Sequence, residues 1–148
     1  TITINRGSSD GVAMGQTVVS GQGLVGQVSA VTANSAQVLL IIDQNSHVEA
    51  RLQGSSAQGT IVGSINGQLE MDFVEKNQSV TRKEVVVTSG TGQLFVKGVP
   101  IGVIDEVSDQ EIEYFKSISV TPFVEFGTLE EVMVLVAAVG GAPVTLEE

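Results

Sequence analysis

Residues 17–28 read Thr-Val-Val-Ser-Gly-Gln-Gly-Leu-Val-Gly-Gln-Val, and two incompatible folds can begin from this stretch. The spacing Gly21-x-Gly23-x-x-Gly26 after an apolar run matches the fingerprint of a dinucleotide-binding unit, with Asp43 as the ribose-binding acid. Nucleotide binding requires residues 24–36 to form a helix whose N-terminus faces a pyrophosphate. Those residues are rich in Val, and Asn34-Ser35 is typical of a turn between two strands. The sequence therefore favours a glycine-rich hairpin, with nucleotide binding as the alternative.

Strand-like patterns recur along the rest of the chain. In residues 68–73, alternation of period two places Leu69, Met71 and Phe73 on one face of a half-buried strand. Further alternating or uniformly apolar runs of strand length occur at 38–42, 47–52, 85–87, 117–126 and 132–136. The uniformly apolar runs among them predict strands covered on both faces. Helical signals are thin, the best being residues 108–116, so the sequence predicts an all-β fold with frequent glycine turns.

Two parts of the chain resemble each other. The run Val18-Val19-Ser20-Gly21, leading to Leu24–Val28, is similar to Val87-Thr88-Ser89-Gly90, leading to Val99–Val103. Such an internal echo indicates two related β units. We expect a first β-barrel subdomain at 1–60, a second at 61–139 with strand exchange between them left open, and a tail at 140–148.

Composition narrows the function classes. The chain has 148 residues, 42% of them hydrophobic, which is enough for a real core. The net charge of −10 is concentrated in residues 105–148, where ten acidic residues face Lys116 alone. Nucleic acid and anionic lipid bind to surfaces rich in Lys and Arg, so the charge argues against both as partners.

Two absences in the sequence limit the chemistry further. The chain has no Cys, which excludes disulfides and thiolate metal sites. The longest apolar stretch, residues 132–142, is shorter than the roughly 20 residues that a spanning helix needs. The chain also begins without Met or a signal-like segment, so we expect that any membrane anchor belongs to a longer protein.

One motif suggests a hydrolase. Gly7-x-Ser9-x-Gly11 has the spacing of a nucleophile elbow, and His47 is the only histidine that could act as base. Asp43 precedes His47 by four residues and could orient it, although an Asp in a turn usually accepts backbone hydrogen bonds. Because His47 alternates with Glu49 on the polar side of a strand, we expect an exposed histidine and no catalysis.

Acidic pairs and one aromatic residue complete the candidates. Asp105-Glu106, Glu130-Glu131 and Glu147-Glu148 lack the spacing of a calcium loop, so we expect solvated charges and no metal. Glu130-Glu131 stands directly before an apolar run and fits a guard against strand aggregation, with partner binding as the alternative. Phe123, on the face opposite Val120 and Val124, is a candidate exposed contact for a partner.

The chain contains an ordered series of short motifs that resembles the MreC family over nearly its full length. Each element that carries the likeness is weak alone, but the series and its spacing are specific. The elements are Ile4–Ser8, Asp10–Val12 with Gly15, Gly23–Val28, Val38–Ile41 with Asp43, Gly59–Gly63, Val85–Gly90 and Gly98–Gly102. Two departures stand out: Lys83-Glu84 replaces a common Gly-Asp, and Phe95-Val96 replaces a common Phe-Pro.

The resemblance implies a fold and a role. The fold would be two small, roughly six-stranded β-barrels of Greek-key, chymotrypsin-like topology without a working triad. The role would be a non-enzymatic scaffold of the cell-elongation machinery that maintains rod shape by organising peptidoglycan synthesis, without a cofactor. A degenerate hydrolase-like or nucleotide-binding domain remains the alternative.

The resemblance also implies partners and a location. The expected partners are further copies of the chain, the elongation-specific penicillin-binding protein and the MreB/MreD/RodA complex. The expected location is the extracytoplasmic face of the bacterial cytoplasmic membrane, through an N-terminal transmembrane helix and a coiled coil in the full-length protein. The family motifs matched here are chiefly turn and core positions, so they identify no partner-binding residue.

Overall fold

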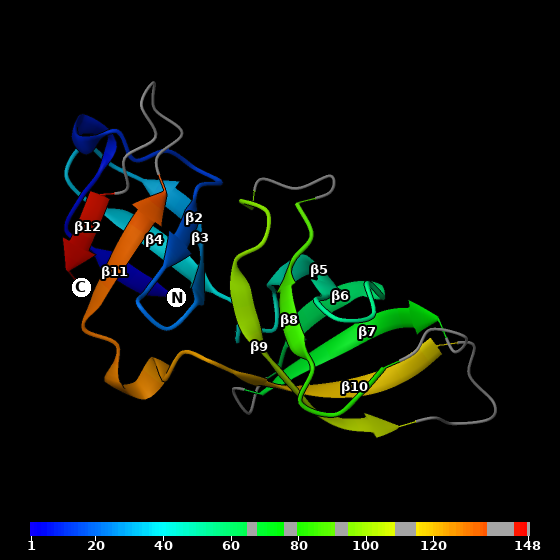
Figure 1. Ribbon diagram of the computed structural model, residues 1–148. Coiled ribbons are helices and arrows are strands. Elements are labelled where there is room, and N and C mark those ends of the chain that lie inside the picture. Colours follow the sequence, from blue (N-terminus) through cyan, green and yellow to red (C-terminus); the bar gives the residue numbers. More distant parts are fainter. Residues whose placement is uncertain (65–67, 76–79, 91–94, 109–114, 136–143, 148) are drawn as a thin grey trace.

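The computed structural model describes residues 1–64, 68–75, 80–90, 95–108, 115–135 and 144–147. These residues form two β-sheets that lie side by side, one closed into a barrel and one open (Figure 1). The predicted all-β fold is confirmed, since the only helical elements are two short 3-10 turns in the described residues, η1 (Ser8–Asp10) and η2 (Phe126–Thr128). None of the described helices is long and apolar enough to cross a bilayer.

The closed barrel is built from one continuous part of the chain. Its strands are β5 (His47–Leu52), β6 (Gln58–Gly63), β7 (Leu69–Glu75), β8 (Val85–Thr88), β9 (Pro100–Ser108) and β10 (Phe115–Pro122). All pairings are antiparallel, and going round the barrel the order is β5-β6-β7-β10-β9-β8, with β8 returning to β5. Two three-stranded meanders joined in this way give the Greek-key, chymotrypsin-like arrangement that the sequence resemblance implies.

The open sheet draws on both ends of the chain. Its strands are β1 (Ile2–Ile4), β2 (Thr17–Val19), β3 (Leu24–Val31), β4 (Ala36–Leu40), β11 (Glu131–Leu135) and β12 (Val144–Glu147). They follow the order β1-β4-β3-β2-β11-β12, with no pairing between β1 and β12 among the described residues. The six strands expected for each unit are present, but only the second sheet closes.

The sheets group the strands differently from the division at residue 60. β5 and β6 belong to the closed barrel, although both begin before residue 61. β11 comes from the second half of the chain, yet it pairs with β2 of the open sheet. In this pairing Val134 lies opposite Val18. The segment expected as a tail contains β12, because Val144–Glu147 alternates and pairs with β11. The division of the chain into two folding units, 1–60 and 61–139, stays a prediction.

The internal echo of the sequence has a counterpart in the strand registers, offset by one residue because Val86, and not Val87, is the equivalent of Val18. Val18 pairs with Gly26 on β2 and β3, and Val86 pairs with Gly102 on β8 and β9, each with a register shift at the next residue. A Cβ atom at Gly26 would collide with the carbonyl oxygen of Leu39 on β4, and one at Gly102 with that of Thr121 on β10. Glycine therefore permits the same close strand approach in both sheets.

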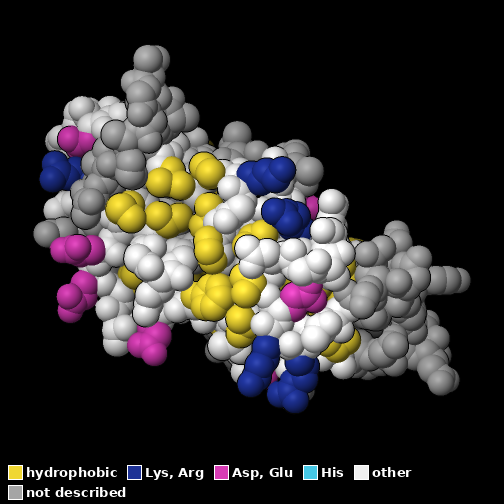
Figure 2. Space-filling view, viewed as in Figure 1, with side chains coloured by type: hydrophobic (Ala, Val, Ile, Leu, Met, Phe, Trp, Pro, Cys, Tyr) yellow, Lys and Arg dark blue, Asp and Glu magenta, His cyan; other side chains and the backbone are white. Residues whose placement is uncertain are grey.

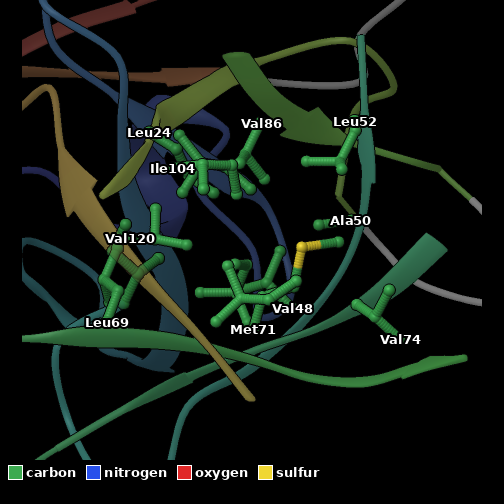
Figure 3. Close-up of a cluster of buried hydrophobic side chains, with 14 of the residues drawn as sticks. Leu24, Val48, Ala50, Leu52, Leu69, Met71, Val74, Val86, Ile104 and Val120 are labelled. Atoms are coloured by element: carbon green, nitrogen blue, oxygen red, sulfur yellow. The ribbon is translucent and has the colours of Figure 1, made fainter. Parts of the chain in front are cut away.

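Two clusters of buried side chains form the core, one in each sheet. The cluster inside the closed barrel includes Leu69, Met71, Val86, Ile104 and Val120, which point toward one another in Figure 3. Leu24 joins this cluster, although it begins β3 of the open sheet, and it is fully buried. The open sheet therefore contributes a side chain to the core of its neighbour.

One strand departs from the predicted alternation. Leu69 and Met71 are buried as expected, but Phe73 is 62% exposed and Val74 is buried instead. Between Met71 and Val74, β7 carries one residue more than the facing β10, which is a β-bulge. Phe73 has a φ of 64° within this bulge, so Val74 faces the core in its place.

The strand limits agree with most of the sequence expectations. β5 covers the predicted residues 47–52, whereas β10 ends at Pro122 and Phe126 lies in η2. The best helical candidate, residues 108–116, begins with the end of β9 and finishes with the start of β10. Its middle, residues 109–114, lies outside the described residues.

A buried threonine from each sheet holds the backbone of the same residue, Val96, in the β8–β9 connection. The N–H of Val96 donates to Oγ1 of Thr17 on β2 at 2.9 Å, and Oγ1 of Thr88 on β8 donates to the carbonyl of Val96 at 2.6 Å. Both threonines are almost completely buried. Phe95, the preceding residue, packs in the barrel core. The connection is thus fixed to both sheets at once.

The position of Leu24 predicts a large loss of stability on truncation. Leu24→Ala should lower the free energy of unfolding by about 2–5 kcal/mol, because it leaves a cavity where β3 fills the barrel core. Leu39→Ala, at a half-buried position of the same sheet, should cost clearly less. Urea unfolding followed by circular dichroism measures both values, and equal losses would contradict the role given to Leu24.

The bond between Thr17 and Val96 predicts a second, smaller effect. Thr17→Val keeps the side-chain shape but leaves the N–H of Val96 without this acceptor, so unfolding should become easier by about 1–3 kcal/mol. Thr3→Val, on the exposed face of β1, is the matched control and should change little. The same unfolding experiment serves, and a Thr17 variant as stable as its control would refute the importance of this bond.

Candidate interaction surface

The structure does not bring the hydrolase candidates together. Ser9 lies on η1 of the open sheet, where its Oγ donates to the carbonyl of Ala33 at 2.6 Å. His47 is exposed at the start of β5 in the closed barrel, as the sequence predicts. Oδ1 of Asp43 accepts the N–H of Asn45 at 2.8 Å, which is the predicted backbone role of an Asp in a turn. These residues therefore have separate structural roles.

The glycine motif is a hairpin, as favoured by the sequence. Gly21 and Gly23 lie in the turn between β2 and β3, and the N–H of Ser20 donates to the carbonyl of Gly23 at 2.9 Å. Residues 24–31 form strand β3, so no helix N-terminus follows the glycines. A Cβ atom at Gly23 would lie 2.7 Å from the carbonyl oxygen of Pro100, so the turn packs against the start of β9.

The acidic pairs occupy strands and their ends. Asp105 is exposed on β9, and Glu130 and Glu131 are exposed where β11 begins. Of the last pair, Glu147 belongs to β12 and Glu148 lies outside the described residues. Among the described residues, no three His, Cys, Asp or Glu side chains lie together in a group that could hold a metal ion.

Phe123 differs from its predicted exposure. Its side chain is half-buried beside the Gly23 turn, because its N–H donates to the carbonyl of Ile101 at 3.0 Å and holds the chain against β9. Two residues on, the N–H of Glu125 donates to Oε1 of Gln22 at 3.2 Å. Phe123 is thus part of the contact between the sheets.

Two cavities lined by described residues are shallow and lie at the ends of strands. One of about 330 Å³ lies beside the β4–β5 turn and is lined by Thr1, Leu40, Ile42, Asp43, Gln44, Asn45 and Ser64. The other, of about 360 Å³, is lined by Gln68, Leu69, Asp105, Ser119, Val120, Thr121 and Pro122. Each holds one carboxylate among uncharged side chains, a poor set for acid–base catalysis or anion binding.

An apolar stripe runs across the junction of the two sheets. On β11, Val132 and Val134 face the core, so Met133 and Leu135 lie half-buried on the opposite face. Met133 pairs with Val19 of β2, and Leu135 pairs with Thr17. Thr17 in turn holds Val96, whose own side chain is 46% exposed. We call Val19, Met133, Leu135 and Val96 the junction stripe.

Opposite charges flank the junction stripe. Glu131 shares the outer face of β11 with Met133 and Leu135 and is exposed. At the other end, exposed Lys97 follows Val96. Figure 2 shows hydrophobic side chains gathered over the β11 region and the junction, with acidic groups along one border and Lys or Arg groups at the opposite one.

Sequence reasoning missed this surface for a definable reason. The run 132–136 predicts a strand covered on both faces, whereas Met133 and Leu135 lie on a half-buried outer face. The alternation of Val with Met and Leu is the only local signal, since all these side chains are apolar. The exposure of Val96 depends on Thr17, which is remote in sequence.

Comparisons with known proteins agree over most of the chain. The family described as "Rod shape-determining protein MreC, barrel core" matches residues 1–136. The cell shape-determining protein MreC of Escherichia coli is 30% identical over 99% of this chain and 41% of its own length. That of Haemophilus influenzae is 29% identical over 90% of the chain and 38% of its own length. The chain thus spans about two fifths of these relatives.

Solved structures have the same fold. MreC from Pseudomonas aeruginosa aligns with a TM-score of 0.83 at 29% identity, covering 90% of this chain and 86% of that one. A complex between Penicillin-Binding Protein (PBP2) and MreC from Helicobacter pylori aligns with a TM-score of 0.64 at 18% identity, over 76% and 69% of the chains. A periplasmic domain from "the cell shape-determining filament MreC" gives 0.71 at 23% identity, over 82% and 77%.

The last two likenesses concern the fold alone, because their sequence identities lie below 25%. The family match is independent of them and covers every described strand except β12. Its description as a barrel core agrees with the closed barrel of the structure. The chain belongs to the rod shape-determining protein MreC family.

Proposed function

We propose that this chain is the extracytoplasmic β-rich part of a non-enzymatic scaffold that maintains rod shape by organising peptidoglycan synthesis. The observation that carries the proposal is the match of residues 1–136 to the MreC barrel core. The fold supports it, because both sheets bury their cores fully and leave an apolar junction stripe at the surface. A contiguous apolar strip that stays partly open to solvent is typical of a protein that binds another protein.

A direct role in catalysis has no support from the geometry. Ser9 is engaged with Ala33, and His47 lies on the other sheet. The glycine-rich segment is a hairpin and therefore presents no helix N-terminus to a nucleotide. We therefore propose that the chain binds proteins and leaves the chemistry of wall synthesis to its partners.

The partners follow from the proposed role. We propose that the chain self-associates and binds the periplasmic domain of the elongation-specific penicillin-binding protein, and that the full-length protein connects it to MreB, MreD and RodA. The solved complex of the Helicobacter pylori MreC with PBP2 supports a penicillin-binding protein as one of these partners. An N-terminal transmembrane anchor in the full-length protein would hold the chain at the outer side of the cytoplasmic membrane.

Mixed sedimentation tests the scaffold proposal. The chain, sedimented alone and with the purified periplasmic domain of its own organism's elongation transpeptidase, should form a mixed complex whose weight-average mass rises with concentration. A penicillin-binding protein that acts in division is the matched control and should bind more weakly. Identical sedimentation of the chain with and without the elongation enzyme would refute the proposed partnership.

Cell-shape complementation tests the alternative function. Full-length protein carrying Ser9→Ala and His47→Ala together should restore rod shape as well as the parent, because neither side chain takes part in a catalytic group in the structure. Immunoblotting confirms equal protein levels. Round cells at a normal level of the double variant would revive the hydrolase hypothesis and contradict the scaffold role.

A further inference from the structure

We propose that the junction stripe is the face on which a second copy of this chain docks, with Glu131 of each copy opposite Lys97 of the other. The inference rests on the proposed scaffold function and names the surface that would serve it. It is carried by two observations of the described residues. They are the apolar stripe itself, half-buried at Val19, Met133 and Leu135 and exposed at Val96, and the opposite charges at its ends.

The apolar part of the stripe is held rigidly. Met133 and Leu135 belong to β11, which pairs on both edges, with β2 and with β12. Val19 lies beside Met133 and also packs against the barrel core. Val96 is fixed through its backbone by Thr17 and Thr88. A preorganised apolar surface loses little conformational entropy when a partner covers it.

The two ends of the stripe have opposite charge. Glu131 and Leu135 are four residues apart on one strand, which separates their Cα atoms by roughly 13 Å. Leu135 pairs with Thr17, whose Oγ1 lies 2.9 Å from the nitrogen of Val96, and Lys97 is the next residue. The apolar side chains therefore lie between an exposed carboxylate and an exposed ammonium group.

This arrangement is complementary to itself. A two-fold axis through the middle of the stripe reverses its direction in the second copy, so each acidic end meets a basic end. Apolar side chains then cover apolar side chains, and two Glu131–Lys97 pairs form at the rim. Pairs at a rim contribute chiefly to orientation and specificity, which is what a defined assembly requires.

The charge of the rest of the chain favours the same occupant over a strongly basic partner. The net charge of −10 would attract a basic protein, but such a partner would meet Lys97 at one end of the stripe. A strongly acidic partner would be repelled by the chain and by Glu131. A second copy satisfies both ends, although its net charge opposes association at low salt.

Charge exchange provides the decisive experiment. Sedimentation equilibrium of the parent chain should show reversible dimers, measured in moderate salt so that net repulsion is screened. Glu131→Lys alone and Lys97→Glu alone should each weaken the dimer about ten-fold or more, because like charges then face each other. The double variant E131K/K97E restores opposite charges and should return the dissociation constant to within about three-fold of the parent.

A second pair of variants tests the apolar middle. Met133→Lys should weaken the dimer by at least as much as either single charge change, because a charge would be buried between the copies. Val62→Lys is its control, since Val62 is a half-buried residue on the outer face of β6 in the closed barrel. This control should fold and dimerise like the parent, and circular dichroism checks that both variants are folded.

The outcomes separate the surface from the scaffold function. Restoration by the double variant supports the docking face. Dimers that are insensitive to all three charge variants, or a double variant as weak as the singles, would overturn the surface while self-association stands. A strictly monomeric parent that still binds the elongation transpeptidase overturns the surface and leaves the scaffold in place. A monomer indifferent to the transpeptidase overturns both.

Discussion

The antiparallel pairing of β2 with β11 is the interaction on which the arrangement of the whole chain depends. It joins Val18 to Val134, both fully buried, and so brings the C-terminal part of the chain back to the N-terminal sheet. The closed barrel is formed by the residues between these strands and is therefore tethered at both of its ends. Leu24 then fills the barrel core from the open sheet, which makes the packing of each sheet depend on the other. Loss of the β2–β11 pairing would free the C-terminal end of the closed barrel from the open sheet and expose the cores of both sheets to solvent.

The same pairing creates the surface that we assign to protein binding. It places Met133 beside Val19 and Leu135 beside Thr17, and Thr17 carries the peptide of Val96. Each of these side chains alone is an ordinary apolar residue, and only the folded register makes them contiguous. The surface therefore exists only when the two ends of the chain have met. A scaffold built in this way exposes its binding face only after folding is complete, which limits association of unfolded chains.

Local patterns were sufficient for most strands and insufficient for the order of the strands. The alternation in residues 47–52 predicts β5 correctly, and the Val-rich hairpin reading of residues 17–28 is right because β-branched residues disfavour the competing helix. Phe73 could not be predicted, because a bulge is decided by the facing strand. The partner of β11 could not be predicted either, since Glu131–Leu135 fits any sheet with an apolar inner face. Among the candidate residues, the exposure of His47 could be predicted from the alternating pattern of its strand. The place of Val96 in the junction stripe could not, because it depends on the hydrogen bond to Thr17.

The repeated hairpins explain why the contact between the sheets arises where it does. β2–β3 and β8–β9 share a register shift and a glycine approach, but a short turn, Ser20–Gly23, joins the first pair, whereas residues 89–99 join the second. The longer connection reaches the open sheet, where Val96 meets Thr17, while the neighbouring Phe95 packs in the core of its own barrel. A Pro at position 96 would have no N–H to donate to Thr17, so this bond depends on the residue type at that position. The hydrogen bond between the sheets therefore comes from a residue of the connection, outside the register and glycine approach that the two hairpins share.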